Sequence, residues 1–125
     1  MTIEGLGFLN EKLESLEIPY QYMEWTSSVP RTYFVGEYTE TVQADEGGEI
    51  DSDFILTGTT KNKYYNLELV KQQVQEAFPP EGLTATLDNG WGIAIMYSGA
   101  MPIPSIQEGI HRIQITLQVK EWKGV

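Results

Sequence analysis

Apolar residues recur along the chain with two different periods, and each period predicts one kind of secondary structure. Near the start, four leucines follow one another at intervals of three, four and three residues: Leu6, Leu9, Leu13 and Leu16. This spacing places them on one face of a helix. Pro19 is expected to stop that helix.

A second helical pattern spans about residues 64 to 78. Its apolar positions recur at the same spacing: Leu67, Val70, Val74 and Ala77 or Phe78. Asn62 or Asn66 is a candidate cap for its first turn, because a short polar side chain can accept from the free backbone N–H groups there. Pro79 and Pro80 are expected to end it.

The remaining apolar stretches predict strands. Their expected bounds are Tyr20–Trp25, Tyr33–Val42, Asp53–Thr60, Leu83–Leu87, Trp91–Tyr97 and a last strand over residues 112–120. The last strand alternates most clearly, from Ile113 to Val119, so one of its faces is expected to be buried. Asp88-Asn89-Gly90 predicts a tight turn, because asparagine and glycine tolerate positive φ.

These elements predict an α+β fold and a single domain over residues 1–125. The short connections favour a twisted, mostly antiparallel sheet of about five or six strands. Two helices are expected on one face of the sheet. The two long strands around residue 46 predict a long β-hairpin arm with an acidic tip.

The amino-acid composition limits the classes of function and of partner that the chain can have. The chain has 125 residues, no cysteine, and 18 acidic against 8 basic residues, for a formal net charge of -10. That charge repels phosphate backbones, so we expect no nucleic-acid binding, although it suits a wall past which DNA slides. The simpler alternative is that the negative charge only keeps the protein soluble.

Without a signal peptide or an apolar run of roughly 20 residues, we expect a cytoplasmic protein and no membrane partner.

The acidic hairpin tip is the first candidate site. Its carboxylates are Asp45, Glu46, Glu49, Asp51 and Asp53. Calcium prefers such oxygen ligands, but their spacing does not match the twelve-residue calcium loop, so we expect no metal. A solvated loop is the favoured interpretation. The other alternative is a tip that becomes ordered against a neighbouring subunit.

A loop expected from Gly99 to Gly109 is the second candidate. It carries Met101, Ile103 and Ile106 among prolines that favour an extended path. Either these apolar side chains pack on the core, or they contact a partner.

Catalytic signals are weak, and we expect no enzyme and no cofactor. His111 is the single histidine, so no histidine pair can hold a metal. Ser98 lacks the glycine pattern of a nucleophile elbow. Glu37 and Glu40 are three apart on a predicted strand and therefore face opposite sides.

Element order, size and acidity together give the chain a resemblance to a known family. The hairpin residues 33–40, the acidic tip, the return over 54–59 and the end over 113–122 resemble the tail-terminator or tail-completion proteins of long-tailed bacteriophages and prophages. The resemblance covers most of the chain and is one of pattern. Closely related minor tail and head–tail joining proteins share it.

The resemblance implies a non-enzymatic virion protein made in the bacterial cytoplasm. It would form a ring, usually of six subunits, that joins the tail tube to the head connector, and DNA would pass through without specific binding. The free protein is expected to be monomeric, because like-charged subunits repel one another. The carboxylates of the tip and the three apolar residues of the loop are the candidate contact or lumen residues.

Other interpretations remain open at this point. A head–tail connector or a minor tail protein of the same particle is one alternative. A small-ligand-binding α+β domain is another, and it needs a pocket with convergent polar groups. A regulator that mimics DNA with an acidic surface is the third.

Overall fold

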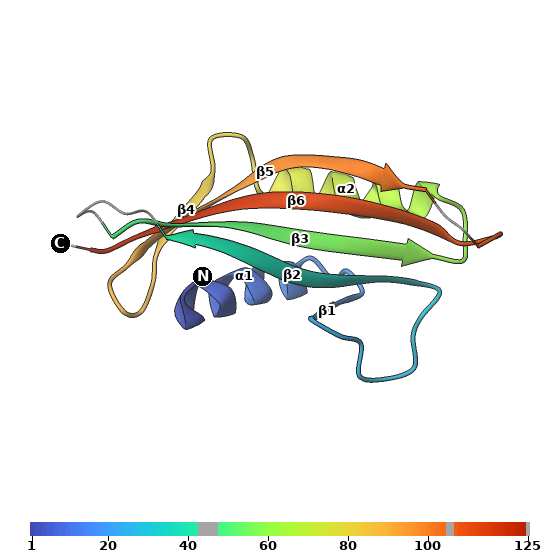
Figure 1. Cartoon of the computed structure of the whole chain (residues 1–125), viewed down its shortest axis with the longest axis horizontal. Helices are drawn as coiled ribbons and strands as arrows, with labels where there is room; N and C mark the ends of the chain where they lie inside the picture. The colour runs from blue at the N-terminus through green and yellow to red at the C-terminus, as the bar shows by residue number, and fades with distance from the viewer. Residues whose placement is uncertain (43–47, 105–106, 125) are drawn as a thin grey trace.

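A computed structural model describes residues 1–42, 48–104 and 107–124. The elements follow the predicted order of helix, strand, hairpin, helix, hairpin and strand (Figure 1). Their bounds are α1 Ile3–Ser15, β1 Tyr20–Tyr22, β2 Thr32–Val42, β3 Ile50–Thr60, α2 Tyr65–Ala77, β4 Leu83–Thr86, β5 Gly92–Ile103 and β6 His111–Trp122. The predicted α+β class is confirmed.

All six strands form one sheet in the order β1-β2-β3-β6-β5-β4. The last strand, β6, therefore lies in the middle, antiparallel to both β3 and β5. The predicted hairpin is β2–β3, with 11 register pairs from Thr32↔Thr60 to Val42↔Ile50. Because β6 pairs with all 11 residues of β3, the described part of this hairpin arm is built into the sheet.

Both helices cover the same face of this sheet. In Figure 1, α2 runs behind β5 and β6, and α1 lies along the β1–β2 side. Their buried residues, such as Leu13 and Val74, form one core cluster with Phe34, Phe54 and Leu117 from the strands. Leu67, Val70 and Val74 are buried as the helical spacing predicts. The core is thus a single layer between helices and sheet.

Helix α1 is fastened to the sheet at its first turn. The Thr2 hydroxyl caps the helix by accepting from the Gly5 N–H at 2.9 Å. The Thr2 backbone N–H in turn donates to the Glu121 carboxylate at 3.1 and 3.2 Å, and the Thr2 hydroxyl donates to it as well. Glu121 belongs to β6 and is fully buried. A buried carboxylate is favourable beside the positive end of a helix.

The predicted apolar face of α1 is confirmed, but its four leucines are buried to different extents. Leu9 and Leu13 are fully buried, whereas Leu6 and Leu16 are half-buried at the rim of the core. The helix ends at Ser15, before Pro19, and Glu17 takes a left-handed φ of 59° where the chain turns toward β1. Burial raises the pKa of the Tyr20 phenol, which remains a donor to the Asn10 side chain.

Several predicted boundaries were wrong. The strand expected over Tyr20–Trp25 ends at Tyr22, because Met23 adopts a left-handed φ of 66°. This strand pairs parallel to β2, whereas all other pairs of neighbouring strands in the sheet are antiparallel.

Neither Asn62 nor Asn66 caps α2, because its N-cap is Tyr64, which makes no side-chain hydrogen bond to the first turn. The Asp88–Gly90 turn is confirmed, and Gly90 has a φ of 87°.

Gly5 and Gly7 provide a matched test of the α1 anchor. A Cβ at position 5 would collide with the Glu121 carboxylate, whereas one at position 7 meets nothing within 4 Å. We expect Gly7→Ala to stabilise the protein by about 0.5–1 kcal/mol through helix propensity. Gly5→Ala is expected to destabilise it by about 1–3 kcal/mol, because the carboxylate and the cap must shift.

Urea denaturation of both variants measures these changes. Gly5→Ala should become neutral or stabilising when Glu121 is also replaced by alanine. If Gly5→Ala and Gly7→Ala stabilise the chain equally, the packing of α1 on Glu121 is not as described.

Candidate functional surface: the uncovered face of the sheet

The face of the sheet turned away from the helices is the main candidate for function. On β6, the apolar residues from Ile113 to Val119 point to the core, and the alternate residues point to the other face. Gln114, Thr116, Gln118 and Lys120 are half-buried there. No helix of the described chain packs over them, so this face, called the open face below, is available to a partner.

Register places the side chains of the open face in rows across the strands. One row joins Tyr33, Thr59, Arg112 and Ile103; the next joins Val35, Thr57, Gln114 and Met101. At the opposite end of the sheet, Thr41, Asp51, Lys120 and Ala94 form a row. Threonine and β-branched residues suit a pleated, half-buried surface, and Asp51 opposite Lys120 is a favourable pair of charges.

Charge is distributed unevenly between the two sides of the molecule. The strand positions of the open face hold three carboxylates, Glu37, Asp51 and Asp53, and two cations, Arg112 and Lys120. Most of the net charge of -10 therefore lies elsewhere. Helix α1 alone exposes Glu4, Glu11 and Glu14 against one exposed cation, Lys12. The open face is thus nearly neutral, and the helix side is acidic.

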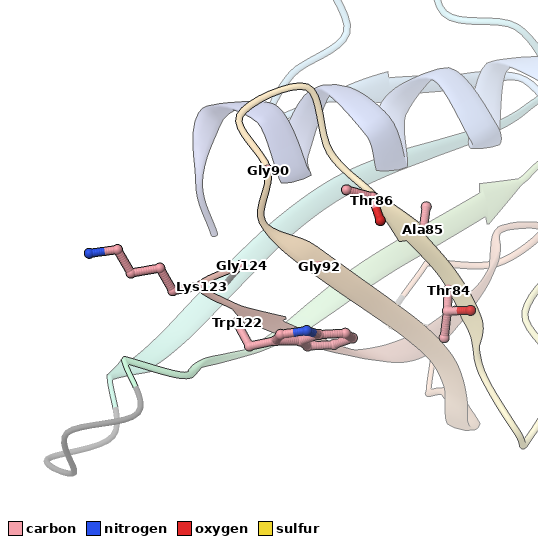
Figure 2. Close-up of a pocket in the computed structure, with 8 residues that line it drawn as sticks. All are labelled: Thr84, Ala85, Thr86, Gly90, Gly92, Trp122, Lys123 and Gly124. Atoms are coloured by element: carbon pink, nitrogen blue, oxygen red, sulfur yellow. The ribbon is translucent and has the colours of Figure 1, made fainter.

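A shallow pocket of about 490 Å³ lies at one end of the sheet (Figure 2). There β4 ends, β5 begins and β6 ends. Its lining residues are Thr84, Ala85, Thr86, Gly90, Gly92, Trp122, Lys123 and Gly124. The Trp122 indole lies across Gly92, its register partner, and remains 40% exposed. Lys123 is the single ionisable side chain of this lining and points away from the indole.

The acidic tip is only partly within the described residues. Asp45 and Glu46 lie outside them. Glu49 is half-buried just before β3, and Asp53 lies in this strand as predicted. The strand begins at Ile50, so Asp51 also lies in β3 and not in a loop, which corrects the predicted hairpin boundary. The reason is that register partners on β2 and β6 extend to Ile50, so pairing overrides the low strand propensity of aspartate.

The predicted loop from Gly99 to Gly109 was also too long. Met101 and Ile103 belong to β5, which continues past an irregularity between Tyr97 and Gly99. Pro102 is tolerated because β4 pairs only with Gly92–Ile95, so no described strand needs an N–H from the far edge of β5 there. Met101 is 55% exposed, Ile103 is half-buried, and Ile106 lies outside the described residues.

Among the described residues, the acidic candidates and the apolar candidates lie in different parts of the sheet. Asp51 is level with Lys120 at one end of β6, whereas Met101 and Ile103 are level with Gln114 and Arg112 toward the other end. The Trp122 pocket was missed by the sequence reasoning. A usable signal existed, because the alternation of β6 continues to Trp122 and places it on the open face.

Residues 1–42, 48–104 and 107–124 contain no group of three acidic or histidine side chains close enough to hold a metal ion. None of the helices described there is long and apolar enough to cross a membrane.

Comparison with solved structures shows that the fold recurs elsewhere. A chain of the virion of a native gene transfer agent particle matches 88% of this chain and 84% of its own length, with 14% identity and a TM-score of 0.66. A second structure, whose name states no function, matches 100% of this chain and 98% of its own, with 12% identity and a TM-score of 0.67. No protein-family model and no curated protein matches the sequence.

The contact between Gly92 and Trp122 can be tested by adding one methyl group. Gly92→Ala places a Cβ where the indole lies, so the ring must leave its place. We expect a loss of about 1–3 kcal/mol in urea denaturation and a shifted Trp122 indole N–H signal in the ¹⁵N spectrum.

The matched control is the double variant Gly92→Ala/Trp122→Ala. With the indole gone, the added methyl group should cost much less than it does alone. Equal costs in the two backgrounds would show that the indole does not rest on Gly92.

Proposed function

We propose that this protein is a non-enzymatic structural component of a phage-like virion, and more specifically a tail terminator. In that role it forms a ring at the head-proximal end of a long tail and joins the tail to the head connector. One observation carries the proposal: a chain within a gene transfer agent virion has the same fold over 88% of this chain. The sequence resemblance to tail-terminator proteins supports the finer assignment.

The two sides of the molecule suit such a role. The strand positions of the open face are nearly neutral, and depletion of charge is a property of surfaces that contact other protein subunits. The exposed carboxylates of α1, Glu4, Glu11 and Glu14, suit the side along which DNA passes, because they repel phosphate. The role requires no catalytic group and no cofactor.

The proposed partners follow from the same arrangement. Copies of this chain contact one another head-to-tail and close into a ring of six, the number usual in the family it resembles. The tail tube protein and the head connector bind the two rims. The proposed location is the host cytoplasm during assembly and the virion tail afterwards.

Assembly is expected to depend on salt and on a template. Subunits of net charge -10 repel one another at low ionic strength, and salt screens this repulsion over about 10 Å at 0.1 M. We expect a monomer at low salt, and closed oligomers at high salt or on addition of purified tail tubes. Sedimentation velocity and electron microscopy of the capped tube ends provide the measurement.

Absence of a closed oligomer under every condition, with tail tubes included, would contradict the proposal. As a control, duplex DNA should not sediment with the protein at any salt concentration.

A connector or minor tail protein of the same particle is the second candidate, because the gene transfer agent neighbour is described only as part of a virion. A labelled antibody that marks the neck or the tube wall, and not the tail end, would favour it.

A further inference from the structure

The pocket at the end of β6 contains a preformed aromatic surface. We call the indole of Trp122, with Gly92 beneath it and Thr84 and Thr86 beside it, the Trp122 platform (Figure 2). Position 92 cannot carry a side chain without displacing the indole, so the flat arrangement depends on a glycine. Trp122 is 40% exposed, which leaves ring surface for a partner.

An exposed apolar segment without a described partner lies at the other end of the same two strands. We call residues 101–104, Met101-Pro102-Ile103-Pro104, the Pro segment. Met101 is 55% exposed, and both prolines are exposed. Ile103 is the register partner of Arg112, while Gly92 is the partner of Trp122. These pairs are ten positions apart on β6, roughly 33 Å at the rise of an extended strand.

The two surfaces have complementary chemistry. Pairing with β6 holds residues 101–103 extended in β5, so the segment is preformed and loses little conformational entropy on docking. Extended segments that contain proline dock on grooves lined by aromatic rings. Glycine and small threonine side chains leave room around the indole. Neither surface contains a carboxylate, and Lys123 is the single charged lining residue of the pocket. Two copies of net charge -10 approach at least cost through such uncharged regions.

We propose that the Pro segment of one copy docks on the Trp122 platform of the next copy. This inference rests on the proposed function, since it names the contact by which the subunits join. The two surfaces differ and lie at opposite ends of the molecule (Figure 1). A contact between them is therefore heterologous, and its repetition produces a ring or a chain instead of an isolated dimer.

The contact is small, which fits a subunit that stays monomeric until a template gathers the copies. A four-residue segment buries far less than the ~800 Å² per partner of a standard stable interface. Each single contact is therefore weak, and closure of the ring adds avidity by raising the effective concentration of neighbouring copies.

Disulfide trapping tests the contact directly, because the chain has no cysteine of its own. Thr86→Cys places a thiol on the Trp122 platform, and Met101→Cys places one on the Pro segment. Under mild oxidation at high salt, a mixture of the two single variants should yield cross-linked heterodimers. The double variant Thr86→Cys/Met101→Cys should yield a ladder of covalent oligomers that ends in a closed species.

Matched variants separate this contact from random collision. Ser28→Cys with Met101→Cys has the same number of thiols but places one in an exposed loop, and its cross-linked fraction gives the background. Adding Trp122→Ala, or Pro102→Ser with Pro104→Ser, to the double-cysteine variant should lower the cross-linked fraction about tenfold, because each removes a central contact group. Thermal melts confirm that each variant is folded.

Complementation supplies a second readout without cysteines. Trp122→Ala retains the Pro segment, and Pro102→Ser/Pro104→Ser retains the platform. Each variant alone should stay monomeric, whereas their mixture should form a weak 1:1 heterodimer through its one intact contact, seen at high salt and high protein concentration, and no larger species. A symmetric interface would not complement in this way.

The outcomes distinguish this inference from the function it rests on. If closed rings form in sedimentation but cross-linking between positions 86 and 101 stays at the background level, the docking proposal is overturned and the ring function stands. If neither rings nor cross-linked oligomers form, even with tail tubes, both fail. Cross-linking above background that Trp122→Ala abolishes supports the proposal.

Discussion

The placement of both helices on one face of the sheet is the constraint on which the other features depend. Strand β6, between β3 and β5, turns Ile113, Ile115 and Leu117 toward the helices and the alternate residues away from them. One helix layer is enough to bury a core from Met1 to Val119. The opposite face is left uncovered by any described helix, as is common for an antiparallel sheet with one packed and one solvated face, and its strand positions are nearly neutral.

The first residues and the last strand hold this arrangement together. Glu121 accepts hydrogen bonds from Thr2, and Thr2 caps α1, so a single buried carboxylate joins the start of the helix to the centre of the sheet. Leaving that carboxylate without its donors would carry the full desolvation penalty of a buried charge. The interaction therefore fixes the position of α1, and with it the acidic side of the molecule relative to the open face.

Much of the fold could be predicted from local patterns, because the leucines of α1, the alternation of β6 and the Asp88–Gly90 turn act through nearest neighbours in sequence. The sequence predictions were wrong where residues distant in sequence determine the local structure. Asp51 is a strand residue because β2 and β6 pair with it, and Pro102 is accepted because it lies at a strand edge. The indole of Trp122 over Gly92 depends on register between β5 and β6, which no local pattern specifies.

The central position of β6 also has a consequence for biosynthesis. On the ribosome, β2, β3, β4 and β5 all emerge before β6, although β3 and β5 both need β6 as a hydrogen-bonded neighbour. Until it leaves the exit tunnel, the sheet exists as two separate parts with unpaired inner edges. Completion of the sheet therefore waits for β6, and nascent chains on one polysome are open to mispairing during that interval.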